Sequence, residues 1–115
     1  MAGDWQELAR RLDRASGCDT ALDAAVAEAF EQPAADYSAS VDAARRLVAA
    51  ALPGWTLHLG FGATGVFPYA GLAADGTRIV CDAPTVPLAV LRVAVAVRAL
   101  PPRPASPEPS ALPAS

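Results

Sequence analysis

The sequence predicts a single α+β domain with three helices, then a three-stranded antiparallel meander, then one very apolar helix. Three observations predict it. Apolar residues recur at helical spacing through residues 5–51, the pattern changes to alternation over 55–82, and a long apolar segment follows at 86–100. The chain has 115 residues, which suits one domain with one core. We expect this domain to span residues 1–100, with helices packed on the sheet as in an α/β/α sandwich.

The first half of the chain carries three segments with an apolar stripe at helical spacing. Each segment is bounded by residues that begin or end helices, such as an acidic or hydroxyl N-cap and a following glycine or proline. The first segment spans about 5–15, and the other two lie between the boundary residues named next. The boundary residues are Asp4 and Gly17 for the first, Asp19 or Thr20 and Pro33 for the second, and Ser38 or Ser40 and Pro53 for the third.

Apolar and polar residues then alternate in three short runs, which is the pattern of half-buried strands. The predicted strands are 55–62, 66–73 and 77–82, and the Asp-Gly pair before the third is a hairpin signal. Pro68 cannot donate a ladder hydrogen bond, so it predicts a bulge or an interruption in the second strand.

The last ordered segment, 86–100, is apolar on nearly all sides. Thr85 can cap a helix there, and Pro87 stands in the first turn, where a missing N–H is harmless. The alternating valines and alanines of 93–97 also fit a strand, but the length and the start signal favour a helix. Such a helix is usually buried on several sides.

Composition argues against several classes of function. The net charge is −3 and every cation is an arginine that lies near acidic residues, so a nucleic-acid partner is not expected. The apolar segment 86–100 is shorter than the ~18 residues of a membrane span and carries Arg92 and Arg98, so no membrane association is expected. The N-terminal residues do not resemble a signal peptide, which predicts a cytoplasmic protein.

Two cysteines and one histidine cannot supply a four-ligand zinc site, and no cofactor is expected. His58 and Cys81 could in principle form a nucleophilic pair. In a meander their strands are separated by the middle strand, so their backbones would lie about 9–10 Å apart. The pairing is therefore not expected, and a minimal enzyme using His58 is the least favoured hypothesis. The carboxylates of Asp19 and Asp23 are interpreted as helix-capping or solvated groups.

Gly60, Gly62 and Gly65 match the pattern G-x-G-x-x-G of phosphate-binding loops. In a dinucleotide site this pattern opens a helix, whereas here Pro68 follows closely and no helix start is visible. A kinase-type glycine loop would also need a lysine, which the chain lacks. We interpret the segment as a glycine-rich hairpin turn. A small-ligand or nucleotide site at these glycines and His58 is the alternative hypothesis.

Several aromatic residues could form a ligand platform or pack between sheet and helices, and core packing is favoured. Pro68 and Tyr69 are the candidates for an exposed protein-contact patch. The proline-rich residues 101–115 predict an extended, disordered tail. Its PxxP pattern at 101–104 could dock on a partner, and an inert tail is the favoured interpretation.

Four segments in this order resemble the phage ABA sandwich domain proteins, small proteins of phages and prophages. The similarity covers roughly residues 5–100. It implies a sheet between helical layers and a phage or prophage setting, and it implies no activity and no catalytic residue. The segments are DAAVAEA at 23–29, YSASVDAA at 37–44, PGW at 53–55 leading to LGFG at 59–62, and APTVPLA at 83–89.

These observations predict a non-catalytic phage or prophage accessory protein that acts by binding another protein. The host-cell cytoplasm is the expected location. A homodimer is a further hypothesis, because the apolar final helix could bury a surface against a second copy.

Overall fold

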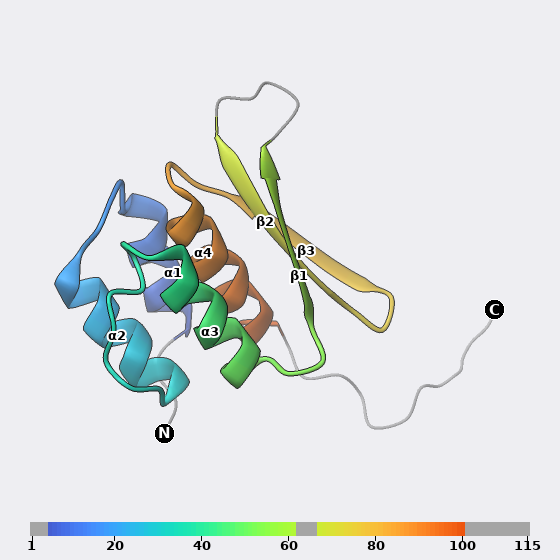
Figure 1. Ribbon diagram of the computed structural model, residues 1–115, viewed down its shortest axis with the longest axis horizontal. Helices are drawn as coiled ribbons and strands as arrows, with labels where there is room; N and C mark the ends of the chain where they lie inside the picture. The colour runs from blue at the N-terminus through green and yellow to red at the C-terminus, as the bar shows by residue number, and fades with distance from the viewer. Residues whose placement is uncertain (1–4, 62–66, 101–115) are drawn as a thin grey trace.

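The computed structural model describes residues 5–61 and 67–100. Within them the chain forms four helices and one three-stranded sheet, in the predicted order (Figure 1). The α+β class is therefore confirmed. The elements are α1 (Trp5–Arg14), α2 (Thr20–Phe30), α3 (Val41–Ala51), β1 (Thr56–Phe61), β2 (Pro68–Ala74), β3 (Thr77–Asp82) and α4 (Val86–Arg98).

Side-chain oxygens cap the three later helices, as their sequences predict. Asp19, Ser40 and Thr85 each accept a hydrogen bond from the backbone N–H three residues further on, at 3.1, 3.1 and 3.4 Å. Each of these bonds satisfies one of the N–H groups that a helix leaves free in its first turn. The predicted cap of α1, Asp4, lies outside the described residues.

The sheet is an antiparallel meander with strand order β1-β2-β3. Asp75 and Gly76 form the β2–β3 turn with φ angles of 50° and 79°, the left-handed conformation that a tight two-residue hairpin requires. Pro68 is the first residue of β2, opposite Phe61. The predicted bulge or interruption at Pro68 is thus wrong, because at the first position of a strand the missing N–H removes no interior ladder bond.

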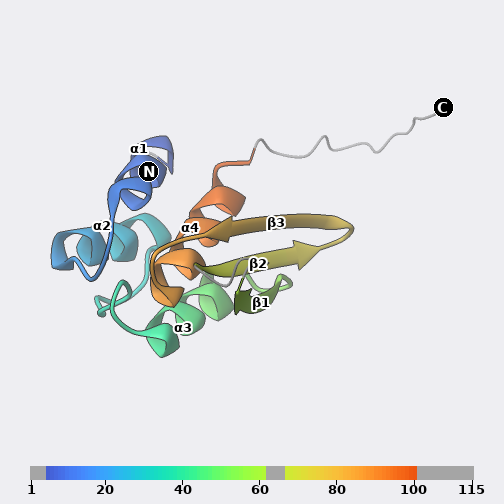
Figure 2. The same ribbon diagram turned by 90° about the horizontal axis from the view of Figure 1, so that it is seen from above.

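Helix α4 lies at the centre of the molecule (Figures 1 and 2). It contacts β2 and β3 on one side and α1 and α3 on others. Most of its side chains are buried, and those of Leu88, Leu91 and Val93 are fully buried. The preference for a helix over a strand and the expected burial on several sides are both confirmed.

The layers differ from the sandwich that the resemblance implies. The described helices lie on one face of the sheet, and none of them covers the opposite face (Figure 2). The reason is that α4 alone occupies the inner face, while α1 and α3 pack on α4 and α2 packs on α1. Among residues 5–61 and 67–100, no helix remains to cover the second face of the sheet.

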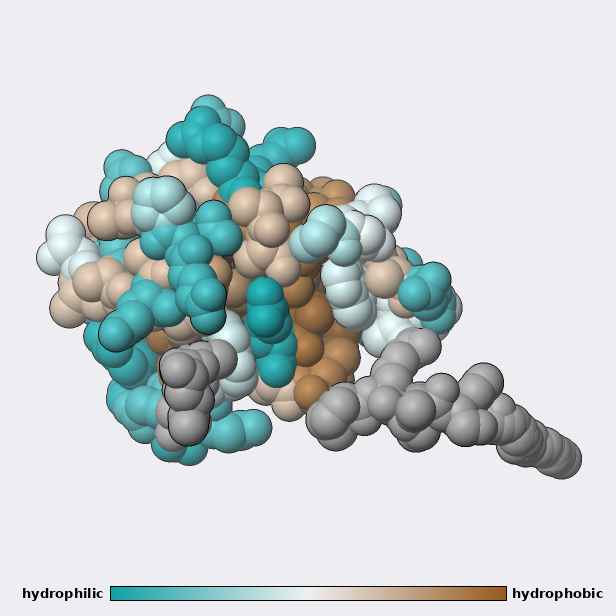
Figure 3. All heavy atoms as spheres, turned by 90° about the horizontal axis from the view of Figure 1, so that it is seen from below, coloured by the Kyte–Doolittle hydropathy of each residue, from teal (hydrophilic) through white to brown (hydrophobic). Residues whose placement is uncertain are grey.

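Hydrophobic side chains come to the surface at the junction between the helices and the sheet, whereas hydrophilic side chains cover much of the helical part (Figure 3). In the part of the chain that the structure describes, no helix combines the length and apolarity needed to cross a membrane.

Arg98, the last residue of α4, contacts each of the three other helices. Arg98 donates to the carbonyl of Ala51 at the end of α3, at 3.0 Å. Its guanidinium also lies 5.7 Å from the ring centre of Trp5 and 5.6 Å from that of Phe30. The two rings meet edge to face at 4.9 Å. This aromatic pair joins α1 to α2, and Arg98 connects both to α3 and α4.

Of the aromatic residues favoured for the joint between sheet and helices, Trp55 is partly buried against the core, whereas the others do not form the joint. Tyr37 is buried in the loop before α3, whereas Phe61 and Phe67 are 64% and 50% exposed. Valine, leucine and alanine side chains of α4 fill the joint instead. Small and branched residues allow the helix to approach the sheet closely.

Candidate functional site

None of the described helices covers the outer face of the sheet, which is called the open face here. The pairing register places one residue from each strand side by side in three rows across this face. Its side chains are mostly exposed, and Val80 is 51% exposed. The rows are Thr56–Ala73–Arg78, His58–Gly71–Val80 and Gly60–Tyr69–Asp82.

Strand β3 is an edge of the sheet, and its hydrogen bonds show which backbone groups face outward. The N–H of Ala83 donates to the carbonyl of Pro68 at 3.1 Å, so position 83 faces β2. The carbonyl of Asp82 instead accepts from Arg92 at 2.8 Å. Because backbone groups alternate in direction along a strand, those of Val80 and Arg78 point to the free edge together with Asp82.

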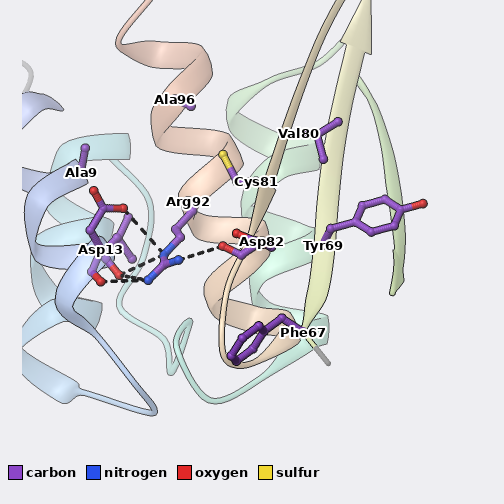
Figure 4. Close-up of a pocket in the computed structure, with 10 residues that line it drawn as sticks. Ala9, Asp13, Phe67, Tyr69, Val80, Cys81, Asp82, Arg92 and Ala96 are labelled. Atoms are coloured by element: carbon purple, nitrogen blue, oxygen red, sulfur yellow. Dashed lines mark hydrogen bonds and ion pairs between the residues drawn. The ribbon is translucent and has the colours of Figure 1, made fainter. Parts of the chain in front are cut away.

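A groove of about 630 Å³ runs along this edge between β3, α1 and α4, and is called the edge groove here (Figure 4). Cys81 points toward α4, whereas Tyr69 points away from that helix. The groove therefore reaches both faces of the sheet around its edge. It is lined by Ala9, Leu12, Asp13, Phe67, Tyr69, Val80, Cys81, Asp82, Arg92 and Ala96.

Arg92 forms the floor of the groove and is occupied by structural contacts (Figure 4). Its guanidinium donates to the carbonyl of Leu12 at 2.9 and 3.1 Å and to that of Asp13 at 3.0 Å. These carbonyls end α1, where a helix leaves acceptors without intrahelical partners. The side chain of Asp13 lies 3.9 Å away and is 74% exposed, so this ion pair adds little. Arg92 thus connects α1, α4 and the end of β3.

The thiol of Cys81 is not arranged for nucleophilic chemistry. Burial raises its pKa above the ordinary value of 9.0, nearby Arg92 lowers it, and Asp13 and Asp82 raise it further. The net effect favours the protonated thiol, whereas nucleophilic attack requires the thiolate. The groove consequently offers a neutral thiol between aliphatic side chains.

The structure separates His58 from Cys81, as the meander predicts. Cys81 shares a row with Leu59 and Ala70 on the inner face, whereas His58 lies in the neighbouring row on the open face. The two side chains therefore point to opposite sides of the sheet. His58 is exposed.

Gly60 has a packing role that the sequence pattern does not reveal. A Cβ atom at this position would lie 2.9 Å from the ring of Tyr69, closer than side-chain packing tolerates. The glycine thus makes room for the aromatic ring on the neighbouring strand. The remaining glycines of the predicted ligand loop, Gly62 and Gly65, lie outside the described residues.

The structure places the two residues of the predicted contact patch differently. Tyr69 is half-buried on the open face, but Pro68 is buried and cannot serve as an exposed contact. The reason is the strand register, which places Pro68 on the inner face beside Ala83. The exposed neighbours are Phe67 and Val80, which sequence reasoning missed. The signal for Val80 was the alternation of 77–82, which gives it the opposite orientation to Ile79 and Cys81.

The acidic residues at the start of α2 are structural. Asp19 caps the helix, and its N–H donates to the Ser38 hydroxyl at 2.8 Å. Asp23 is buried and accepts from the Ser38 N–H at 2.7 Å. Across the described ranges 5–61 and 67–100, no group of three histidine, cysteine or acidic residues could hold a metal ion.

Comparisons of the chain with family models, with curated proteins and with solved structures find no match. The site is therefore interpreted from its own geometry. Its main features are an open sheet face and an accessible strand edge, with the edge groove between them.

Proposed function

We propose that this protein is a non-catalytic accessory protein of a phage or prophage that binds another protein through the open face of its sheet. The binding role rests on the geometry of that face. The phage setting and the bacterial cytoplasm rest on the resemblance of residues 5–100.

The observation that carries the binding role is a helix-free sheet face with apolar and aromatic side chains on it. Tyr69 and Val80 lie in neighbouring rows, and Phe67 borders them in the edge groove. Exposed aromatic and aliphatic groups of this kind are enriched at protein interfaces. Gly71 and Ala73 between the outer strands keep the centre of the face flat, so that a partner surface can approach the strands.

The side chains that would support catalysis either form structural hydrogen bonds or favour an unreactive protonation state. Arg92 bonds to three carbonyls, Asp23 to a backbone N–H, and the Cys81 pKa favours the thiol. A nucleotide site at the glycine pattern gains no support from Gly60, whose space is filled by Tyr69.

The test is an affinity pull-down of the tagged full chain from host lysate, with and without phage induction, read by mass spectrometry. We expect a stoichiometric partner that is lost in Tyr69→Ala and in Val80→Asp. Both positions lie on the open face, so the fold should survive, which circular dichroism can verify.

The matched control is Glu28→Ala, an exposed position on α2 far from the sheet, which should retain the partner. Deletion of residues 101–115 should also retain it. A partner that survives both open-face substitutions but is lost with the tail would contradict the proposal, as would the absence of any stoichiometric partner.

A further inference from the structure

We propose that the free edge of β3 pairs antiparallel with β3 of a second copy of this chain, with Val80 on the two-fold axis, to form a continuous six-stranded sheet. This interface uses the edge of the sheet and does not depend on the proposed partner at the open face. It also differs from the dimer through the apolar final helix, because α4 is enclosed by the sheet and by α1 and α3.

The backbone supplies the first part of the argument. Arg78, Val80 and Asp82 direct their N–H and C=O groups to the free edge, as the bonds of Ala83 and Asp82 establish. Within the described residues only the Asp82 carbonyl has a partner there, namely Arg92. A strand that presents unpaired donors and acceptors is a template for another strand.

The side chains supply the second part, because the strand is complementary to itself. When two copies of Thr77–Asp82 run antiparallel about Val80, the two exposed valines meet. Arg78 of each copy then lies directly opposite Asp82 of the other, on the same face of the sheet. Both charged side chains are exposed and available for this contact. Opposite charges at directly opposed positions stabilise strand pairs.

The edge groove provides space beside β3 for the strand of the second copy. A neighbouring strand would lie about 4.8 Å from β3. The groove follows β3 from Val80 to Asp82, and its helix side presents the small side chains of Ala9 and Ala96. Ile79 and Cys81 of the second copy would enter on this inner side. The groove thus lies on the side of the edge where the inner side chains of the added strand would enter.

The other edge of the sheet lacks this complementarity. By the same alternation, Leu57, Leu59 and Phe61 direct their backbone groups to the free edge of β1. The only ionisable side chain in β1 is His58, so two copies of this strand have no opposite charges to align. The charge pattern therefore selects β3 as the edge for self-association.

Charge reversal tests the pairing directly. Sedimentation equilibrium of the full chain at low salt should show a concentration-dependent dimer. Arg78→Asp places two acidic pairs in the dimer, and Asp82→Arg places two basic pairs. Each single variant should weaken dimerisation at least about tenfold. An equimolar mixture of the two variants should form heterodimers, because every facing pair is then opposite in charge.

Cross-linking tests the register in a background without Cys18 and Cys81. Val80→Cys should form an intermolecular disulfide under mild oxidation, since directly opposed residues have Cα atoms about 5.5 Å apart. Arg78→Cys is the matched control and should not, because the two copies of position 78 would lie about 13 Å apart. Circular dichroism should show all variants folded.

Four results would overturn the proposal, and the first three concern the association of the full chain and its charge variants. They are a monomer at millimolar concentration, single charge variants that dimerise as well as the native chain, or a mixture of the two variants that does not associate. A dimer that disappears when residues 101–115 are deleted would also overturn it, because the tail would then be the occupant of the groove.

Discussion

At the scale of single residues, Arg92 has the widest set of contacts in the described chain. Its guanidinium reaches the last turn of α1 and the end of β3 from the middle of α4. Its side chain is only 17% exposed, so water competes weakly for these donors. Arg98 acts in the same way on the end of α3. The two charges that argue against a membrane helix in the sequence are thus the groups that connect the helices.

We predict that Arg92→Met lowers the free energy of unfolding by about 2–3 kcal/mol, since hydrogen bonds from a charged group are worth about 1.5–3 kcal/mol and the carbonyls lose their partners. Methionine keeps most of the aliphatic stem, so the loss reports on the hydrogen bonds. Urea denaturation followed by circular dichroism measures it.

The matched control is Arg10→Met. Arg10 pairs with Glu7 at 2.8 Å, but both side chains are half exposed. An exposed pair of this kind is worth at most about 1 kcal/mol. An Arg92 variant no less stable than the Arg10 variant would show that the carbonyl contacts contribute nothing.

At the scale of elements, the loop before α3 is held to the start of α2 by Asp23 and Ser38. Asp23 is 6% exposed and Ser38 is 2% exposed. The carboxylate accepts from the Ser38 N–H, and the Ser38 hydroxyl accepts from the Asp19 N–H. These contacts fix the position at which α3 begins and hence its approach to α4.

We predict that Asp23→Ala destabilises the protein by about 1–3 kcal/mol, because the buried N–H of Ser38 loses its acceptor. Asp23→Asn keeps an acceptor oxygen and should recover part of the loss. Thermal or urea unfolding of both variants gives the comparison. Glu28→Ala, at an exposed position of the same helix, should change stability by no more than about 0.5 kcal/mol. Equal effects of Asp23→Ala and Glu28→Ala would contradict this role.

At the scale of the whole molecule, α4 is the only one of the four described helices with extensive contacts both to the sheet and to the other helices. The sheet therefore depends on α4 for its inner-face packing, and α1 and α3 depend on α4 for theirs. A single core of this kind should unfold as one unit. The fluorescence of Trp5 reports on unfolding of the helical part, and that of Trp55, which precedes β1, reports on unfolding of the sheet.

Leu91 is fully buried on α4. We predict that Leu91→Ala lowers the free energy of unfolding by about 2–5 kcal/mol and destabilises the helical part and the sheet together. Fluorescence of single-tryptophan variants, Trp5→Phe and Trp55→Phe, should give coincident urea transitions. Leu100→Ala, at a position that is 41% exposed, should have little effect. Separate transitions for the two tryptophans would show that the sheet and the helices unfold independently.

The sequence by itself determined the element types, their order and most helix starts. Spacing of apolar residues, capping groups such as Asp19, Ser40 and Thr85, and the Asp-Gly turn act over a few residues, so they can be read locally. The predicted meander order likewise placed His58 and Cys81 on strands separated by the middle strand, whereas the register seen in the structure puts them on opposite faces.

The tertiary structure decided which surfaces remain available. The carbonyl of Leu12 lies 80 positions from Arg92 in the chain, and no local pattern pairs them. The open face follows from α4 alone occupying the inner face, and the burial of Pro68 follows from the strand register. Burial and strand pairing depend on which distant segments meet, so the accessible edge at Arg78, Val80 and Asp82 emerges only once the chain is folded.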